Sequence, residues 1–234
     1  MTDQEVSRAY ALAVLDPANG RRLIDGTHWK AGVAGAAILD LVRSGALQLA
    51  EDTRHPGRFG RFVATGHGPL PGPAWDEVVR RVDGQTPKNA VARIGGASSW
   101  TDRAGSLWED ITARLCAEGV VRRDEHRTLG LVPSTRWPVI DAAARSTLLG
   151  RVRATLADGA ARGDIDGSVT TLLYATDALP KVFPGEPRRW LRDQGRVVSR
   201  GDWASDAVRR AVTDVQAAAV AAVTASSTAA TSST

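Results

Sequence analysis

Clusters of arginine are the feature of this sequence that most directly points to a chemistry, because guanidinium groups bind phosphate and carboxylate groups. One cluster surrounds a β-hairpin predicted after residue 119, where apolar side chains lie among the cations. Cations attract anionic lipid while apolar tips enter the headgroup region, so this pattern favours an interfacial membrane contact. An oligomer contact or core packing is the alternative for the same apolar residues. The residues of this hairpin set are Arg122, Arg123, Arg127, Leu129, Leu131 and Val132.

A second group of arginines falls on or beside a helix expected at 186–199. Arg192 and Arg196 are four residues apart, so they share one face of that helix. A solvated surface helix explains these cations about as well as a binding face does. The members of the group are Arg188, Arg189, Arg192, Arg196 and Arg200.

Residues that catalyse reactions or bind metal ions form no recognisable pattern. Cys116 lies among the apolar positions of a predicted helix, which favours a buried structural thiol over a nucleophile. Residues 164–168 resemble the start of a calcium loop, but Ala175 stands where the closing acidic ligand is required. The histidines give no metal-ligand spacing with Cys116; they are His28, His55, His67 and His126. We therefore predict no catalytic residue, no metal site and no cofactor, and a chain that is not an enzyme.

The charge balance and the absence of targeting segments limit the classes of partner. The 234 residues include 30 basic and 26 acidic side chains, for a net charge of +4. This mild excess permits an anionic lipid, a nucleic acid or neither. The first residues lack a signal-peptide pattern, and no apolar run approaches the roughly 18 residues of a membrane span. We expect a cytoplasmic protein, or a peripheral one at the inner face of the membrane.

Apolar periodicity predicts a mainly α fold: a single helical domain over residues 1–224 with small β-hairpins. Residues 225–234 contain only Ser, Thr and Ala, so a disordered tail is expected there. Thr27 is the expected N-cap of the second helix, and Gly45 is expected just beyond its end. In the second hairpin, the turn is expected at 124–126. The predicted helices are 4–15, 28–44, 74–82, 89–94, 106–117, 141–157, 167–179, 186–199 and 202–224, and the hairpins pair 46–50 with 61–64 and 120–123 with 128–132.

A winged helix is the competing interpretation, since a helix that ends at a glycine precedes a basic hairpin over residues 106–132. DNA phosphates would then be the anion. However, the helix that would read the bases carries Glu109 and Asp110, is followed by Glu118, and has Arg114 as its cation. We therefore do not expect nucleic acid to be the partner.

Several stretches, in a fixed order, carry a resemblance to a known family. They are residues 34–41, 44–49, 75–79, 115–123, 129–138 and 201–212, which include the sequences SGALQL, LCAEGVVRR and LGLVPSTRWP. In these stretches the chain resembles the Golgi phosphoprotein 3 family, including its bacterial, mainly actinobacterial, members. The resemblance extends from about residue 5 to about residue 223.

The resemblance implies a helical domain that recognises phosphatidylinositol 4-phosphate without catalysing a reaction. It also implies a hydrophobic hairpin, here Val120–Val132, that assists membrane insertion and self-association. The family's headgroup positions correspond to Asp25, Ala34, Gly105 and Trp108, and none of them keeps the family's residue type. Cations nearby in the sequence are the candidates to replace them, namely Lys30, Arg103 and Arg114.

The predicted function is therefore a peripheral, phospholipid-binding module or adaptor. Its expected partner is an anionic headgroup similar to that of phosphatidylinositol 4-phosphate, and a homo-oligomer is expected through the hairpin. The alternative is a cytosolic scaffold or a winged-helix-like nucleic-acid-binding protein.

Overall fold

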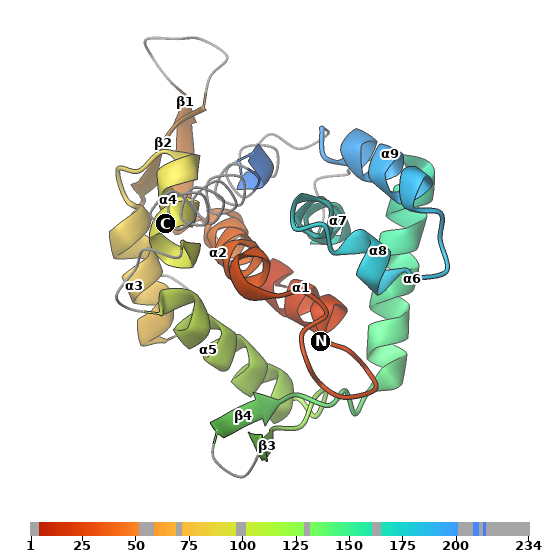
Figure 1. Cartoon of the computed structure of the whole chain (residues 1–234). Helices are drawn as coiled ribbons and strands as arrows, with labels where there is room; N and C mark the ends of the chain where they lie inside the picture. Colours follow the sequence, from red (N-terminus) through yellow and green to blue (C-terminus); the bar gives the residue numbers. More distant parts are fainter. Residues whose placement is uncertain are drawn as a thin grey trace, which may run out of the picture.

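Helices form most of the computed structural model, and two small hairpins lie at its edges (Figure 1). The structure describes residues 5–51, 59–68, 72–96, 102–128, 132–160, 165–200, 208–210 and 213. The helices are α1 (Val6–Val14), α2 (Gly26–Arg43), α3 (Pro73–Val82), α4 (Pro87–Gly95), α5 (Arg103–Ala117), α6 (Ala142–Asp158), α7 (Ile165–Ala175), α8 (Leu179–Val182) and α9 (Arg188–Val198). The predicted mainly α class with small hairpins is confirmed. The expected helix at 202–224 and the tail lie largely or wholly outside the described residues.

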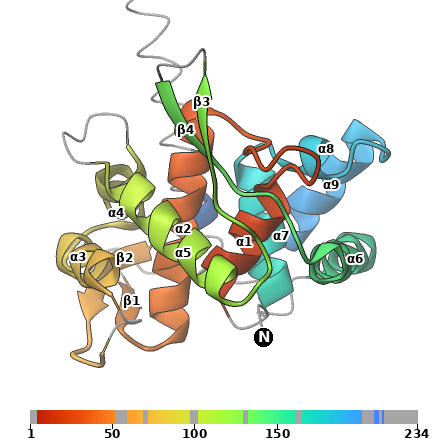
Figure 2. The same cartoon turned by 90° about the horizontal axis from the view of Figure 1, so that it is seen from below.

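Helices α1 and α2 lie in the middle of the molecule. Figure 2 shows α3, α4, α5 and the first hairpin on one side of this pair and α6 to α9 on the other. Every residue of α2 from Ala31 to Leu41 is buried, and most of its side chains are small. A Cβ atom at Gly32 would lie 2.0 Å from the Tyr10 hydroxyl, and one at Gly95 would lie 2.5 Å from the Lys30 carbonyl oxygen. Glycine at these two positions therefore allows α1 and α4 to approach α2 closely.

The ends of the helices show which local predictions were correct. Gly45 follows the end of α2 with a φ of 78°, as expected for a residue just past a helix. The expected N-cap was wrong, because α2 begins at Gly26 with Asp25 at the N-cap position, which leaves Thr27 inside the first turn. Helix α5 begins at Arg103, earlier than predicted, because the Asp102 carboxylate accepts a hydrogen bond from the Gly105 amide at 3.0 Å.

The helix predicted at 167–179 is interrupted. Asp177, just after α7, has a φ of 51°, a left-handed conformation that a helix interior does not accommodate. The chain bends there, and the short helix α8 continues from Leu179.

Each hairpin is a two-stranded antiparallel sheet. Strand β1 (Leu47–Glu51) pairs with β2 (Phe59–Ala64), as predicted. Strand β3 (Asp124–Thr128) pairs with β4 (Val132–Arg136), so the predicted turn at 124–126 was wrong. The apolar pair Val120 and Val121 is buried in the core instead of opening a strand, and β3 is built from polar residues that give no apolar alternation. Residues 129–131 lie outside the described part of the chain.

The start of α1 is capped by a carboxylate from another helix. Asp40 on α2 accepts hydrogen bonds from the backbone amides of Val6 at 2.6 Å and Ser7 at 2.9 Å. Only 4% of Asp40 is exposed, and this burial raises the pKa of its carboxyl group from 3.8 to about 6. The contact fixes the crossing of the two central helices, and it makes their packing sensitive to pH.

We predict that Asp40→Asn flattens the dependence of stability on pH between about pH 4 and pH 6. The folded protein holds this proton more tightly than the unfolded chain, so the free energy of unfolding falls as pH rises through this window, by about 3 kcal/mol. The variant also loses about 1–2 kcal/mol at pH 4, because an amide nitrogen cannot accept one of the two capping bonds. Urea unfolding at several pH values measures both effects.

Asp83→Asn is the control, because Asp83 also accepts a backbone amide hydrogen bond, from Ala64 at 2.9 Å, but in an exposed place. Its pH profile should keep the slope of the wild type. Parallel profiles for the wild type and Asp40→Asn would contradict this account of the central cap.

Candidate anion-binding pocket

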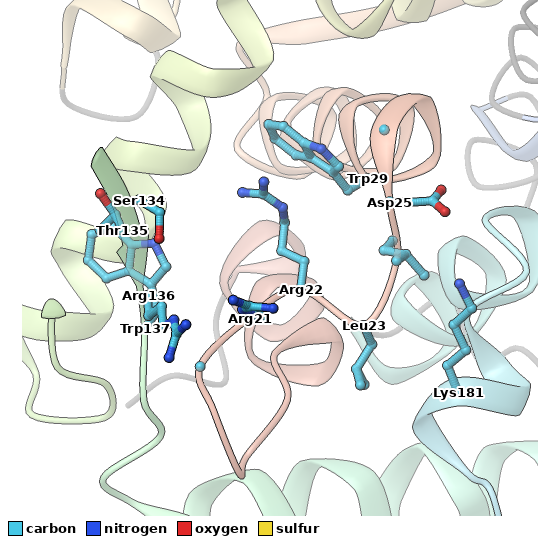
Figure 3. Close-up of a pocket in the computed structure, with 13 residues that line it drawn as sticks. Arg21, Arg22, Leu23, Asp25, Trp29, Ser134, Thr135, Arg136, Trp137 and Lys181 are labelled. Atoms are coloured by element: carbon cyan, nitrogen blue, oxygen red, sulfur yellow. The ribbon is translucent and has the colours of Figure 1, made fainter. Parts of the chain in front are cut away.

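A basic pocket opens where segments distant in the sequence meet. Its walls are the loop before α2, the first turn of α2, the end of β4, and α8 (Figure 3). The cavity measures about 470 Å³, within the ~300–1,000 Å³ of small-molecule sites. The residues that line it are Gly20, Arg21, Arg22, Leu23, Ile24, Asp25, Gly26, Trp29, Ser134, Thr135, Arg136, Trp137 and Lys181.

A stack of one arginine on two tryptophans forms one wall. The Trp29 and Trp108 rings pack edge to face, with centroids 5.8 Å apart and planes at 66°. The Arg22 guanidinium carbon lies 4.1 Å from the centroid of Trp29 and 5.3 Å from that of Trp108. Burial lowers the pKa of Arg22, while Asp102 and Glu109 raise it, and an arginine remains a cation at neutral pH in either case. The stack therefore holds a positive charge at a fixed place.

The opposite wall carries Arg136 beside Trp137, as Figure 3 shows. Trp137 is 2% exposed and lies under Arg123, whose guanidinium carbon is 5.5 Å from the ring centroid. The Nε atom of Arg136 is buried and has no hydrogen-bond partner in the described part of the chain. A buried guanidinium donor of this kind is costly unless an anion or water accepts from it.

Positive charge dominates the lining of the pocket. Asp25 contributes the carboxylate of the lining, and its Oδ1 atom is 3.4 Å from His28 Nδ1. The lining also contains four cations: Arg21, Arg22, Arg136 and Lys181. This excess favours a ligand that carries at least one negative charge.

Gly20 holds the two walls together. Its carbonyl oxygen accepts a hydrogen bond from the Trp137 amide at 2.8 Å. Its φ is 67°, and an added Cβ atom would lie 2.4 Å from the backbone nitrogen of Pro138. The turn before it is closed by Asp16, whose backbone amide donates to the Arg21 carbonyl at 2.7 Å. This tight backbone contact determines where Arg21 and Arg22 lie relative to β4.

The three cations predicted to bind a headgroup do not line this pocket. Lys30 Nζ is 2.9 Å from Asp102, and it also lies 5.6 Å from the Trp29 ring centroid. Arg103 is 3.4 Å from Glu77. Arg114 is 3.1 Å from Asp110. Their role in binding a headgroup stays a prediction.

The family's headgroup positions are divided between the pocket and the core. Asp25 lines the pocket, and Trp108 lies beneath Arg22. Ala34 is fully buried in α2. Gly105 lies in the first turn of α5, where a Cβ atom would lie 2.5 Å from the Asp102 carboxylate. One of the four positions thus lines the cavity and a second lies beneath one of its cations, although their residue types differ from the family's.

Of the hairpin cations predicted to meet a membrane or a second copy, Arg123 lies close to the pocket, over Trp137. Arg122 pairs with Asp124 at 2.7 Å, and Arg123 lies 3.4 Å from both Glu109 and Glu125. The backbones of Arg127 and Val132 belong to β3 and β4, while their side chains, like Leu129 and Leu131, lie outside the described part. The predicted membrane or oligomer contact of this hairpin stays a prediction.

Sequence reasoning missed three of the four cations in the pocket. Arg136 lies in the stretch 129–138 that carries the family resemblance, but Arg21, Arg22 and Lys181 were not singled out from the sequence. A Gly-Arg-Arg sequence directly after a turn is a usable signal for the first two. Lys181 carried no such signal, because only the fold brings α8 to the loop before α2.

Within the ranges that the structure describes, three or more metal-ligating side chains do not gather at any one place. Burial raises the pKa of the partly buried Cys116 thiol, which makes it a poorer nucleophile. None of the described helices is long and apolar enough to cross a membrane.

Comparison with known families identifies the fold. A model of the Golgi phosphoprotein 3 (GPP34) family matches residues 7–215. The chain belongs to this family. The match covers most of the 234 residues, so it confirms the resemblance drawn from the stretches between residues 34 and 212. No curated protein sequence matches the chain.

We predict that Gly20→Ala lowers the free energy of unfolding by about 2–5 kcal/mol. The left-handed backbone accounts for about 1–2 kcal/mol of this. The clash with the backbone at Pro138 accounts for about 1–3 kcal/mol more. Thermal unfolding followed by circular dichroism measures the change.

Gly84→Ala separates the two causes. Gly84 has a φ of 70°, but an added Cβ atom there would meet nothing within 4 Å. Gly84→Ala should lower the free energy of unfolding by about 1–2 kcal/mol, from the backbone conformation alone. Equal losses in the two variants would mean that the Gly20 contact does not fix the pocket walls.

Proposed function

We propose that this protein is a peripheral, non-enzymatic phospholipid-binding module that holds an anionic headgroup in the pocket between Arg22 and Arg136. The observation that carries the proposal is a cavity of about 470 Å³ lined by four cations and one carboxylate. Membership of the Golgi phosphoprotein 3 family supports a lipid-binding adaptor at the coarse level. A headgroup similar to that of phosphatidylinositol 4-phosphate is the specific ligand proposed, at the inner face of a membrane.

The arrangement suits a phosphate group for two reasons. A guanidinium donates two parallel hydrogen bonds to phosphate oxygens, so two arginines on facing walls can hold one group from both sides. Arg22 is already restrained by its stack on Trp29, so less side-chain entropy is lost when a ligand binds. Trp29 is only 6% exposed, so it acts as a support under Arg22 and not as an inserted membrane tip.

The pocket residues that are proposed here differ from Lys30, Arg103 and Arg114. Each of those three cations has a carboxylate within 3.4 Å, which offsets part of its charge. A phosphate group that bound to any of these cations would compete with an ion pair that already exists. No salt bridge to a carboxylate is found for Arg22 or Arg136 among the residues the structure describes, and both side chains line the cavity.

The test is co-sedimentation with vesicles of phosphatidylcholine alone, with phosphatidylglycerol, and with phosphatidylinositol 4-phosphate. The double variant Arg22→Gln/Arg136→Gln should bind the last of these at least about tenfold more weakly than the wild type, a loss of about 1.4 kcal/mol. Binding of the wild type should weaken as salt rises, because the attraction is electrostatic.

Arg80→Gln/Arg81→Gln is the matched control, since it removes two cations from the exposed face of α3, outside the pocket. It should bind about as well as the wild type. Equal losses in the two double variants would show a general charge effect and contradict the pocket. If no anionic vesicle is bound at low salt while a DNA duplex is shifted in a gel, the lipid proposal fails and the nucleic-acid alternative replaces it.

We further predict that Asp25→Asn tightens binding to anionic vesicles about three- to tenfold. It removes the carboxylate that lines the pocket and repels the phosphate, an effect of about 1 kcal/mol at this exposed site. Asp76→Asn makes the same charge change in the exposed first turn of α3 and should leave the affinity nearly unchanged. Unchanged or weaker binding by Asp25→Asn would contradict a phosphate in this pocket.

A further inference from the structure

A second cavity, with a different lining, lies between α7, α8, α9 and the described residues Arg209 and Thr213. It measures about 370 Å³, which is also the size of a small-molecule site. The family's headgroup positions and the hairpin do not contribute to it. The lining combines apolar side chains, among them Leu179 and Leu191, with basic side chains, among them Lys181, Arg188 and Arg192.

The floor of this cavity is apolar. Leu179 is 2% exposed and Leu191 is fully buried, so both present side chains from the core. Gly195 on α9 allows the floor to form, because a Cβ atom there would lie 2.7 Å from the Tyr174 ring and 3.0 Å from Leu179. Arg196 donates a hydrogen bond to Tyr174, and this bond raises the pKa of the Arg196 guanidinium.

The rim of the cavity is cationic. Lys181, Arg188 and Arg192 are exposed, and no ion pair of theirs is found within the described ranges. Arg209 adds a fourth basic side chain, and Asp177 is the carboxylate that faces them. Arg188 lies in the first turn of α9, where the helix dipole disfavours a cation, so helix stability does not explain its position.

An apolar floor beneath a cationic rim fits a ligand that has an apolar part and an anionic part. We infer that this second pocket binds an amphipathic anion, in which a phosphate or carboxylate group is attached to an apolar body. The acidic group lies among Arg188, Arg192 and Lys181, and the apolar body packs on Leu179, Leu191 and Tyr174. This site is separate from the headgroup pocket, although Lys181 borders both cavities.

Isothermal titration of the full chain with octyl phosphate tests the inference. Octanoate tests whether a carboxylate serves as well, while inorganic phosphate and octanol each lack one half of the proposed ligand. We expect octyl phosphate to bind at least about tenfold more tightly than inorganic phosphate, since burial of its methylene groups on the apolar floor adds to the affinity. If neither octyl phosphate nor octanoate binds, or if inorganic phosphate binds as tightly as octyl phosphate, the inference is overturned.

Variants locate the binding event. Arg188→Gln/Arg192→Gln should weaken octyl phosphate binding at least about tenfold, whereas Arg189→Gln/Arg200→Gln removes two nearby cations that do not line the pocket and should have little effect. The variant Arg22→Gln/Arg136→Gln should still bind octyl phosphate. If binding is lost in that last variant and unchanged in Arg188→Gln/Arg192→Gln, the ligand occupies the headgroup pocket instead, and the inference is wrong while the proposed function stands.

Discussion

Helix α2 can be surrounded by other helices because half of its buried positions are Gly or Ala. Tyr10 on α1 lies against Gly32, and α4 lies against the backbone of α2 through Gly95. Helices α5 and α7 also contact α2, so its position constrains both halves of the molecule. The crossing of α1 and α2 is fixed further by the Asp40 carboxylate, which replaces a local cap at the start of α1. Larger side chains in this stretch would separate the two halves.

The basic pocket that Arg22 and Arg136 line follows from that constraint. The first turn of α2 carries Trp29, and the packing of α5 on α2 brings Trp108 into edge-to-face contact with it. This pair gives Arg22 a surface on which to stack, while the contact between Gly20 and the end of β4 brings Arg136 to the opposite wall. The cations of the pocket therefore come from the loop before α2, from β4 and from α8, and the helical core holds these segments in place. A cluster of charges that repel one another is stable here because each segment is anchored by buried neighbours.

The sequence predicted the helices best where apolar residues repeat with helical spacing, as in α1, α2, α3 and α6. It failed for β3, because a strand made of Asp124, Glu125 and their polar neighbours has no buried face to reveal it. Asp177 interrupted a helix that composition alone would continue. The candidate site was only partly predictable, since sequence proximity suggested Lys30 but could not show that Asp102 lies 2.9 Å from it. Lys181 is remote from Arg22 in the sequence, and only tertiary packing brings them to one cavity.

The central claim is that an anion is held between Arg22 and Arg136. The most direct measurement is an NMR titration that follows the side-chain Nε–Hε signals of individual arginines as a water-soluble inositol phosphate headgroup is added. The account predicts saturable shifts at Arg22 and Arg136, whose guanidinium groups face the cavity, and no comparable shift at Arg80 on α3. Shifts of similar size at all exposed arginines, or shifts at Arg80 without any at Arg22 and Arg136, would contradict it.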